Sequence, residues 1–195
     1  RARLLACGAC SSIARCGVCD AAVALANPAA GPGEAFACPR CGAARPQVCT
    51  TCGGTRFRAL RLGVTRAAEE LAALAGEPVA EVTAATALDD PAVAAARVLL
   101  GTEAVLHRIT RADAVAFLDL DQELLAPRFR AGEEALGMLA RAARLVARAD
   151  AGARSAGGGR TGRLLVQTRA PDHPAIEAAV HADPGRLVAA ERPVR

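Results

Sequence analysis

The sequence predicts an α/β fold, a parallel sheet with helices on both faces, which carries a small double zinc-ribbon module near its N-terminus. Three observations predict it. Four CxxC pairs fall between residues 7 and 52, and the rest of the 195 residues contain no further cysteine. From residue 56 onward, strand-like and helix-like segments alternate. The hydrophobic fraction of 52% is sufficient for a core, although aromatic residues make up only 2%.

The eight cysteines have the spacing of structural zinc ligands. Zinc prefers four soft ligands in a tetrahedron, and each CxxC turn can supply one edge of it. The four pairs therefore predict two Zn²⁺ ions per chain in a module of residues 1–55. A redox CxxC usually occurs singly, and the ferredoxin spacings are absent. Because four thiolates leave no open position for a substrate, we expect both metals to be structural.

The four CxxC pairs could combine in three ways. A tandem arrangement joins the first pair to the second across five residues, which is tight, and a crossed arrangement is the main rival of nesting. Nesting joins the inner pairs across 18 residues, within the usual zinc-ribbon spacing, and brings the ends of the module together. The nested ligand sets are Cys7, Cys10, Cys49 and Cys52 for zinc 1, and Cys16, Cys19, Cys38 and Cys41 for zinc 2.

Within the module, two short strands are expected at 21–26 and 34–38, separated by a turn rich in Asn, Pro and Gly. The alternating stretch 56–62 is expected to form the next strand. A helix follows over 65–76, with acidic residues in its first turns and Gly76 as its end. Residues 77–83 are expected to form a strand, and Pro91 marks the start of a helix over 88–96.

Two apolar stretches, 97–102 and 114–121, are expected to be buried strands, and the second carries Asp119 and Asp121 toward its end. An Arg/Ala-rich helix over 127–149 and a glycine-rich loop over 150–162 follow. The remaining elements are a strand over 163–168 and a helix that begins at Pro174. These segments are expected to form a second domain, residues 56–195.

Composition excludes several functions. All 24 basic residues are arginine, so a P-loop, which needs a lysine at the phosphates, cannot occur in this chain. An uncharged apolar run of 18 residues is absent, which predicts no membrane span, and no secretory signal is visible. We therefore expect a cytoplasmic protein with reduced cysteines. The chain begins with Arg1 and is interpreted as a segment of a longer protein.

The order of these motifs resembles one known family. The four CxxC pairs, followed by "LGVTRAAEELAAL", "RVLLGTEAV", "FLDLDQELLAPRFRAGEEALGML" and "GRLLVQTRAPDHPAIEAA", are similar to the C-terminal half of primosomal protein N′ (PriA), the replication-restart DNA helicase. The resemblance covers nearly the whole chain. It implies a RecA-like second helicase lobe with an inserted double-zinc module, and it also implies nested cysteine pairing.

The chain departs from that family at two helicase motifs. After the strand that ends at Gly101, the family sequence is close to "GTQMVAKGHDF", whereas this chain has "GTEAVLHRITRAD". The family sequence "QVAGRAGR" corresponds to "RAARLVAR" here, so one motif arginine falls on Leu145 and the other on Arg148. A helicase arginine must reach a γ-phosphate. The resemblance therefore implies a degenerate, actinobacterial-type member without helicase activity, and no catalytic residue is assigned.

The expected function is that of a PriA-type replication-restart protein, a monomer associated with the nucleoid. Its expected partners are branched or forked DNA, other primosome proteins and single-stranded DNA-binding protein. ATP would bind only together with an upstream lobe outside this chain. Arg141, Arg144 and Arg148 share one helix face and are the candidate DNA contacts.

Two alternatives remain open at the level of the sequence. The first is an active ATP-dependent 3′–5′ DNA helicase whose last motif is rebuilt from nearby arginines. The second is a zinc-ribbon scaffold that binds only protein. The arginines near the cysteines could serve DNA or protein contacts, namely Arg3, Arg15, Arg40, Arg45, Arg56 and Arg58.

Overall fold

The computed structural model describes residues 4–26, 35–60, 64–87, 89–155 and 162–191. Their contacts divide the chain into two compact units, which are treated separately below. The first unit comprises residues 1–61, 117–137 and 166–195, and the second comprises residues 62–116 and 138–165. Among the described residues, every helix is too short or too polar to cross a membrane.

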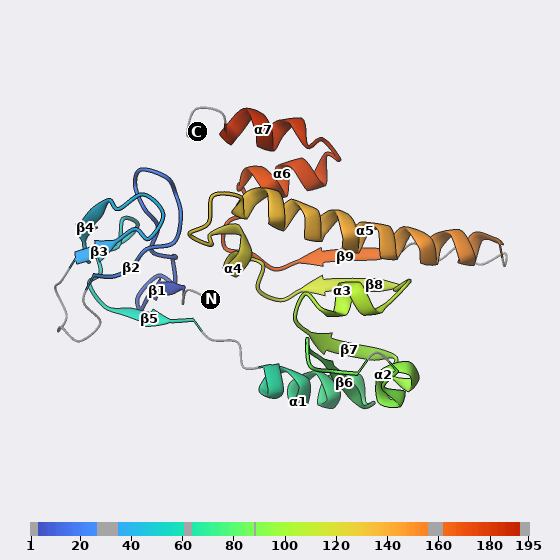
Figure 1. Ribbon diagram of the computed structural model, residues 1–195. Coiled ribbons are helices and arrows are strands. Elements are labelled where there is room, and N and C mark those ends of the chain that lie inside the picture. Colours follow the sequence, from blue (N-terminus) through green and yellow to red (C-terminus); the bar gives the residue numbers. More distant parts are fainter. Residues whose placement is uncertain (1–3, 27–34, 61–63, 88, 156–161, 192–195) are drawn as a thin grey trace. The chain divides into compact units, whose positions relative to one another are not determined.

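Short antiparallel strands form the N-terminal part of the first unit. One pair of strands joins the two ends of the cysteine-rich region, and a separate three-stranded sheet lies within that region (Figure 1). Because Cys7 ends the first strand and Phe57 lies opposite it, the ends of the region are neighbours. The strands are β1 (Leu5–Cys7), β2 (Ala24–Leu25), β3 (Ala35–Ala37), β4 (Ala44–Pro46) and β5 (Phe57–Ala59).

The helical part of the first unit consists of α4 (Asp121–Leu124), α6 (Pro174–Val180) and α7 (Gly185–Glu191). Helices α6 and α7 pack against each other. The backbone N–H of Ala22 donates to the carbonyl of Leu125 at 2.9 Å, so the cysteine-rich region is tied to the segment after α4.

The second unit is built on a parallel pair, β6 (Val79–Val82) and β7 (Val98–Gly101). Helix α1 (Val64–Ala75) packs on both strands, α2 (Pro91–Ala95) packs on β6, and α3 (Val105–Arg108) packs on β7. At Gly101 the strands approach so closely that a Cβ atom would lie 1.8 Å from the carbonyl oxygen of Val82. Glycine is therefore required at this end of the sheet.

Three elements continue from one unit into the other. Strands β8 (Ala114–Phe117) and β9 (Arg163–Val166) form a two-stranded sheet. Its hydrogen bonds join residue 163 to 113 and residue 167 to 117, which is a parallel register. Helix α5 (Ala131–Ser155) has one buried side of alanine, leucine, valine and methionine, which includes Ala135, Leu139 and Ala142.

The mixed α/β class is confirmed, including parallel strand pairs. The strands form small separate sheets among the described residues, and a RecA-like lobe remains a prediction. The expected boundary between residues 55 and 56 also stays a prediction, because the first unit contains the whole expected module and parts of the expected lobe.

Several expected element bounds are wrong. The strand expected over 114–121 ends at Phe117, and Asp121 instead begins α4. The long helix begins at Ala131 rather than 127, because the chain turns tightly after Ala126, whose carbonyl accepts the N–H of Arg128 at 2.7 Å. Its end lies at Ser155, so residues 150–155 are helical rather than part of a loop, while 156–161 lie outside the described residues.

Candidate metal centres

Each of the four CxxC pairs folds into the same turn. The N–H of the residue after the second cysteine donates to the carbonyl of the first cysteine at 2.9–3.1 Å. The N–H of the first cysteine donates to the carbonyl five residues later at 2.8–2.9 Å. This repeated pattern of hydrogen bonds places the two sulfur atoms of each pair on the same side of its turn. We call these turns knuckles, and they cover residues 7–12, 16–21, 38–43 and 49–54.

The fifth residue of every knuckle has a positive φ. It is glycine in two knuckles, Gly42 at 74° and Gly53 at 73°. In the other two it is Ser11 at 61° and Asp20 at 56°, values that L-residues other than Asn and Asp seldom adopt. The sequence analysis did not identify Ser11 and Asp20, although their position directly after CxxC, where the other pairs have glycine, was the available signal.

The structure brings the eight cysteines together in two groups of four. In each group the sulfur atoms all lie within 4.8 Å of one another, and the closest pairs are 3.5–3.6 Å apart. A tetrahedron with Zn–S bonds of about 2.3 Å has sulfur atoms about 3.8 Å apart. The outer group is Cys7, Cys10, Cys49 and Cys52, and the inner group is Cys16, Cys19, Cys38 and Cys41.

This grouping is the nested one, with the inner group enclosed in sequence by the outer one. All eight cysteines are free thiols. Each group offers one sulfur per residue in the spacing of a four-coordinate site, so each could hold a zinc ion. The donor set consists only of sulfur, which suits zinc and leaves no oxygen ligand of the kind that calcium or magnesium requires.

Without metal, individual cysteine thiols differ strongly in acidity, as one ligand from each group shows. Hydrogen bonding with the side chain and backbone of Ser12 lowers the pKa of Cys10 to about 6. Burial, together with the neighbouring sulfur atoms, raises the pKa of Cys19 to about 12. Four thiolates therefore cannot gather at neutral pH unless a cation compensates their charge. A divalent metal supplies that compensation and displaces the remaining protons.

A glycine fits the outer group closely. A Cβ atom at Gly54 would lie 3.2 Å from the sulfur of Cys7 and 3.4 Å from that of Cys52. The chain therefore passes directly over two of the four sulfur atoms. We infer that any side chain at this position would press on the ligand set.

The inner group is part of a hydrophobic core. Phe36 is fully buried there, and its ring meets that of Phe57 edge to face, with centroids 4.8 Å apart. The buried members of this core include two of the ligands themselves. They are Ala14, Cys16, Ala21, Val23, Phe36 and Cys38.

Two of the arginines near the knuckles serve the module itself. The guanidinium of Arg45 lies 4.9 Å from the Phe36 ring centre and donates to the carbonyls of Arg15 and Val48 at 2.9 and 2.7 Å. Arg15 pairs with Asp20 at 2.9 Å. These contacts link the inner group to the start of the last knuckle. Arg3 lies outside the described residues.

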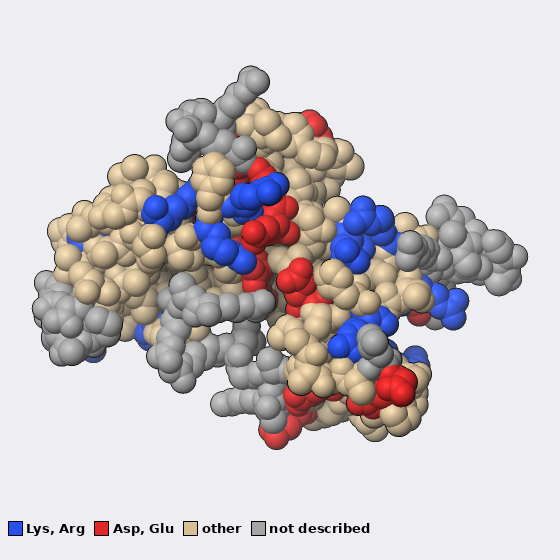
Figure 2. Space-filling view, in the orientation of Figure 1, with Lys and Arg blue, Asp and Glu red and all other residues tan. Residues whose placement is uncertain are grey.

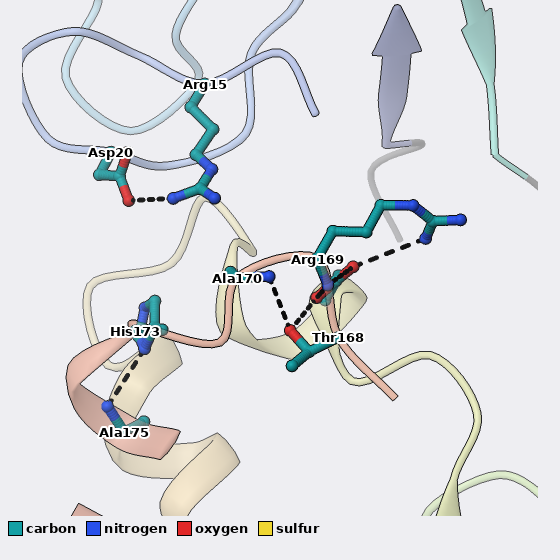
Figure 3. Close-up of polar contacts among 8 residues, drawn as sticks. Arg15, Asp20, Thr168, Arg169, Ala170, His173 and Ala175 are labelled. Carbon is teal, nitrogen blue, oxygen red and sulfur yellow. Dashed lines mark hydrogen bonds and ion pairs between the residues drawn. The ribbon is translucent and has the colours of Figure 1, made fainter. Parts of the chain in front are cut away.

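Asp119 and Asp121 do not form a pair on a strand. Asp121 is buried and accepts hydrogen bonds from the hydroxyl of Thr168 at 2.5 Å and from the backbone N–H of Arg169 at 3.0 and 3.1 Å (Figure 3). It fixes the segment that leads to His173, whose Nδ1 accepts from the N–H of Ala175 and caps α6 (Figure 3). Burial, and then the charge of Asp121, raises the pKa of Asp119. Asp121 therefore has a structural role, since it holds the backbone of this segment in place.

The candidate DNA contacts lie along α5. Arg141 and Arg144 are exposed, and the side chain of Arg148 lies outside the described residues. Leu145, the position of a helicase motif arginine in the resemblance, is only 4% exposed. A side chain at residue 145 is therefore directed into the packed side of the helix, away from solvent.

No family model matches the chain, and no curated protein matches it significantly.

Proposed function

We propose that the chain binds two structural zinc ions and acts as a PriA-type replication-restart protein, which contacts branched or forked DNA without helicase activity. The observation that carries the proposal is the pair of nested four-sulfur groups within residues 7–52. The motifs that resemble PriA link this zinc arrangement to replication restart. The two lines of support are separate, since the sulfur geometry does not depend on the resemblance.

The zinc sites are structural in this proposal because each has a full set of protein ligands. A catalytic zinc keeps one position open for water or substrate, whereas four thiolates close the coordination sphere. The strands around the sites have only two or three residues, so backbone pairing alone gives this region little stability. Metal binding would therefore supply much of its folding free energy.

In this proposal, the absence of helicase activity rests on residue 145. An arginine that stabilises a transferring phosphate must extend into a nucleotide site. The corresponding residue here is an aliphatic side chain buried in α5. The exposed side chains of Arg141 and Arg144 would instead contact phosphates of DNA.

Elemental analysis and DNA titration test the proposal together. We expect two zinc ions per chain in the purified protein. We also expect binding to a fork substrate whose affinity falls steeply with salt, because phosphate contacts release counterions. Arg141→Gln combined with Arg144→Gln should reduce the salt dependence, whereas Arg97→Gln, an exposed arginine outside α5, serves as control. Zinc-free protein that is nevertheless folded, or affinity independent of salt, would contradict it.

One observation favours the scaffold alternative. Arg15 and Arg45, which could have contacted DNA, are instead engaged within the module. On the face drawn in Figure 2, several basic side chains lie next to acidic ones. Arg128 forms ion pairs with Glu123 and Glu134 at 2.6 and 2.9 Å. If fork DNA does not bind at low salt, a protein-binding scaffold is the better assignment.

The helicase alternative has its own test. DNA-stimulated ATP hydrolysis by the full-length protein, which includes any upstream lobe, should be absent. Clear ATP turnover would show that the protein is an active helicase with a rebuilt motif.

A further inference from the structure

A hollow of about 360 Å³ lies beside the inner cysteine group in the first unit. One wall is formed by two knuckles, and the other by the segment between α4 and α5. Its volume is near the lower end of ligand pockets. Its lining residues are Val18, Cys19, Pro39, Arg40, Cys41, Pro127 and Phe129.

Both walls are held by short-range contacts. On one side, Gly42 closes the knuckle through its N–H bond to Cys38 at 2.9 Å. On the other side, Arg128 pairs with two glutamates, and Arg130 pairs with Glu133 at 2.6 Å. The two arginines that flank Phe129 are thereby fixed to their own segment. The ring between them remains 57% exposed, which is a high value for phenylalanine.

One basic side chain lines the hollow and could contact an anionic partner. Arg40 has no hydrogen-bond or ion-pair partner among the described residues. Within the part of the chain that the structure describes, a phosphate could therefore bind Arg40 without competition from an acidic partner.

The size of the hollow argues against a folded protein as its occupant. A stable protein interface covers about 800 Å² on each partner, far more than seven lining residues provide. A single nucleobase has the required size and two flat faces, and bases stack on exposed aromatic rings whatever their sequence. A single strand carries its phosphates outside the bases, where the guanidinium of Arg40 would meet them.

We propose that this hollow receives one base of a single nucleic-acid strand, with the ring of Phe129 stacking on the base and Arg40 contacting an adjacent phosphate. The inference deepens the proposed function and rests on it, since it names the single-stranded part of branched DNA as the ligand of this site. Pro39 and Pro127 would form the apolar sides of the hollow.

The experiment titrates zinc-loaded full chain with a fluorescein-labelled oligothymidine. Phe129→Leu keeps the bulk of the side chain but removes the π face, and we expect it to weaken binding at least about fivefold. Phe129→Tyr keeps the face and should remain within about twofold. Val188→Ser, at an equally exposed apolar residue of α7, is the matched control. Zinc content and circular dichroism establish that each variant is folded.

Arg40→Gln separates a phosphate contact from a structural role. Loss of one phosphate contact should lower the slope of log affinity against log salt by about 0.7 for a single strand. Arg186→Gln, whose arginine pairs with Asp183 on the surface, should leave the slope unchanged. A change in affinity with an unchanged slope would assign Arg40 to structure and overturn its part of the proposal.

Photo-crosslinking tests directly where the base binds. An oligonucleotide containing 5-iododeoxyuridine should crosslink to the peptide that contains Phe129. Equal affinities of the Leu and Tyr variants, or crosslinks only elsewhere, would overturn the proposal that the hollow binds a base. If such results come with intact, salt-dependent binding of fork DNA, only this proposal fails. If fork DNA does not bind either, the proposed function fails.

Discussion

The outer and inner cysteine groups have the same four-sulfur geometry and different surroundings. Two of the outer ligands, Cys10 and Cys52, are exposed, and the group is closed by the β1–β5 pair and by Gly54. The inner group has one exposed ligand, Cys41, and two ligands within the core around Phe36. The comparison teaches that the same ligand pattern can be held together by metal and backbone alone, as in the outer group. In the inner group, hydrophobic packing also contributes to its stability.

Removal of metal should have the largest effect. Structural zinc contributes about 10–16 kcal/mol in isolated zinc-finger peptides, so a chelator should unfold the cysteine-rich region. If packing protects the inner group, zinc should leave in two phases, the outer ion first. The measurement is release followed with a chromophoric chelator.

Cys49→Ser assigns the phases, because it removes an outer ligand. The fast phase should disappear in this variant while the slow one remains. Release of both ions in a single phase would show that packing makes no difference between the groups.

Truncation of the core phenylalanine comes next. Phe36→Ala should destabilise the region by about 3–5 kcal/mol, since a fully buried ring and its contacts with Phe57 and Arg45 are lost. We expect selective loss of the inner zinc, measured by elemental analysis and denaturant unfolding. Phe129→Ala, at an exposed ring, should change stability by less than about 1 kcal/mol. Selective loss of the outer zinc instead would contradict the expected difference between the two groups.

A smaller effect is expected from one methyl group over the outer ligands. Gly54→Ala places a Cβ 3.2 Å from the sulfur of Cys7. Because the ligands cannot move away while they bind metal, we expect a cost of about 1–3 kcal/mol and weaker binding of the outer zinc alone. Gly17→Ala, where the added atom meets nothing within 4 Å, is the control in the inner group. Equal zinc affinities in both variants would contradict the close contact.

The smallest effects concern the positive-φ residues. Gly42→Ala and Gly53→Ala should each cost about 1–2 kcal/mol, because an L-residue is strained at φ near 74°. Ser11→Gly should change stability by less than about 1 kcal/mol, since relief of strain is offset by the greater freedom of glycine in the unfolded chain. Thermal unfolding of the zinc-loaded variants measures both. A destabilising Ser11→Gly would show that its strain is already compensated.

Much of the candidate site could be predicted from the sequence because it depends on local spacing. A CxxC pair encodes its own turn, and the separation of 18 residues between the inner pairs suits a ribbon. The helices that begin at Pro91 and Pro174 were also placed correctly, since proline at the first turn is a local signal.

Positions that depend on distant partners could not be predicted. Asp121 was expected on a strand, and it begins a helix whose buried carboxylate binds Thr168 and Arg169 from a segment nearly fifty residues later. The expected role of Arg45 was equally open, because the ring that it covers belongs to a different strand. Pattern within a short window carries no information about such contacts.

The sequence by itself determined the ligand chemistry: eight thiols in four pairs, no lysine, and alternating strand and helix segments. Only the tertiary structure decided which thiols meet, which arginines remain available to a ligand and which side of α5 buries Leu145. The physical reason is the range of the interactions. Turn geometry and ligand softness act within a few residues, whereas packing and ion pairing join residues that only the folded chain brings together.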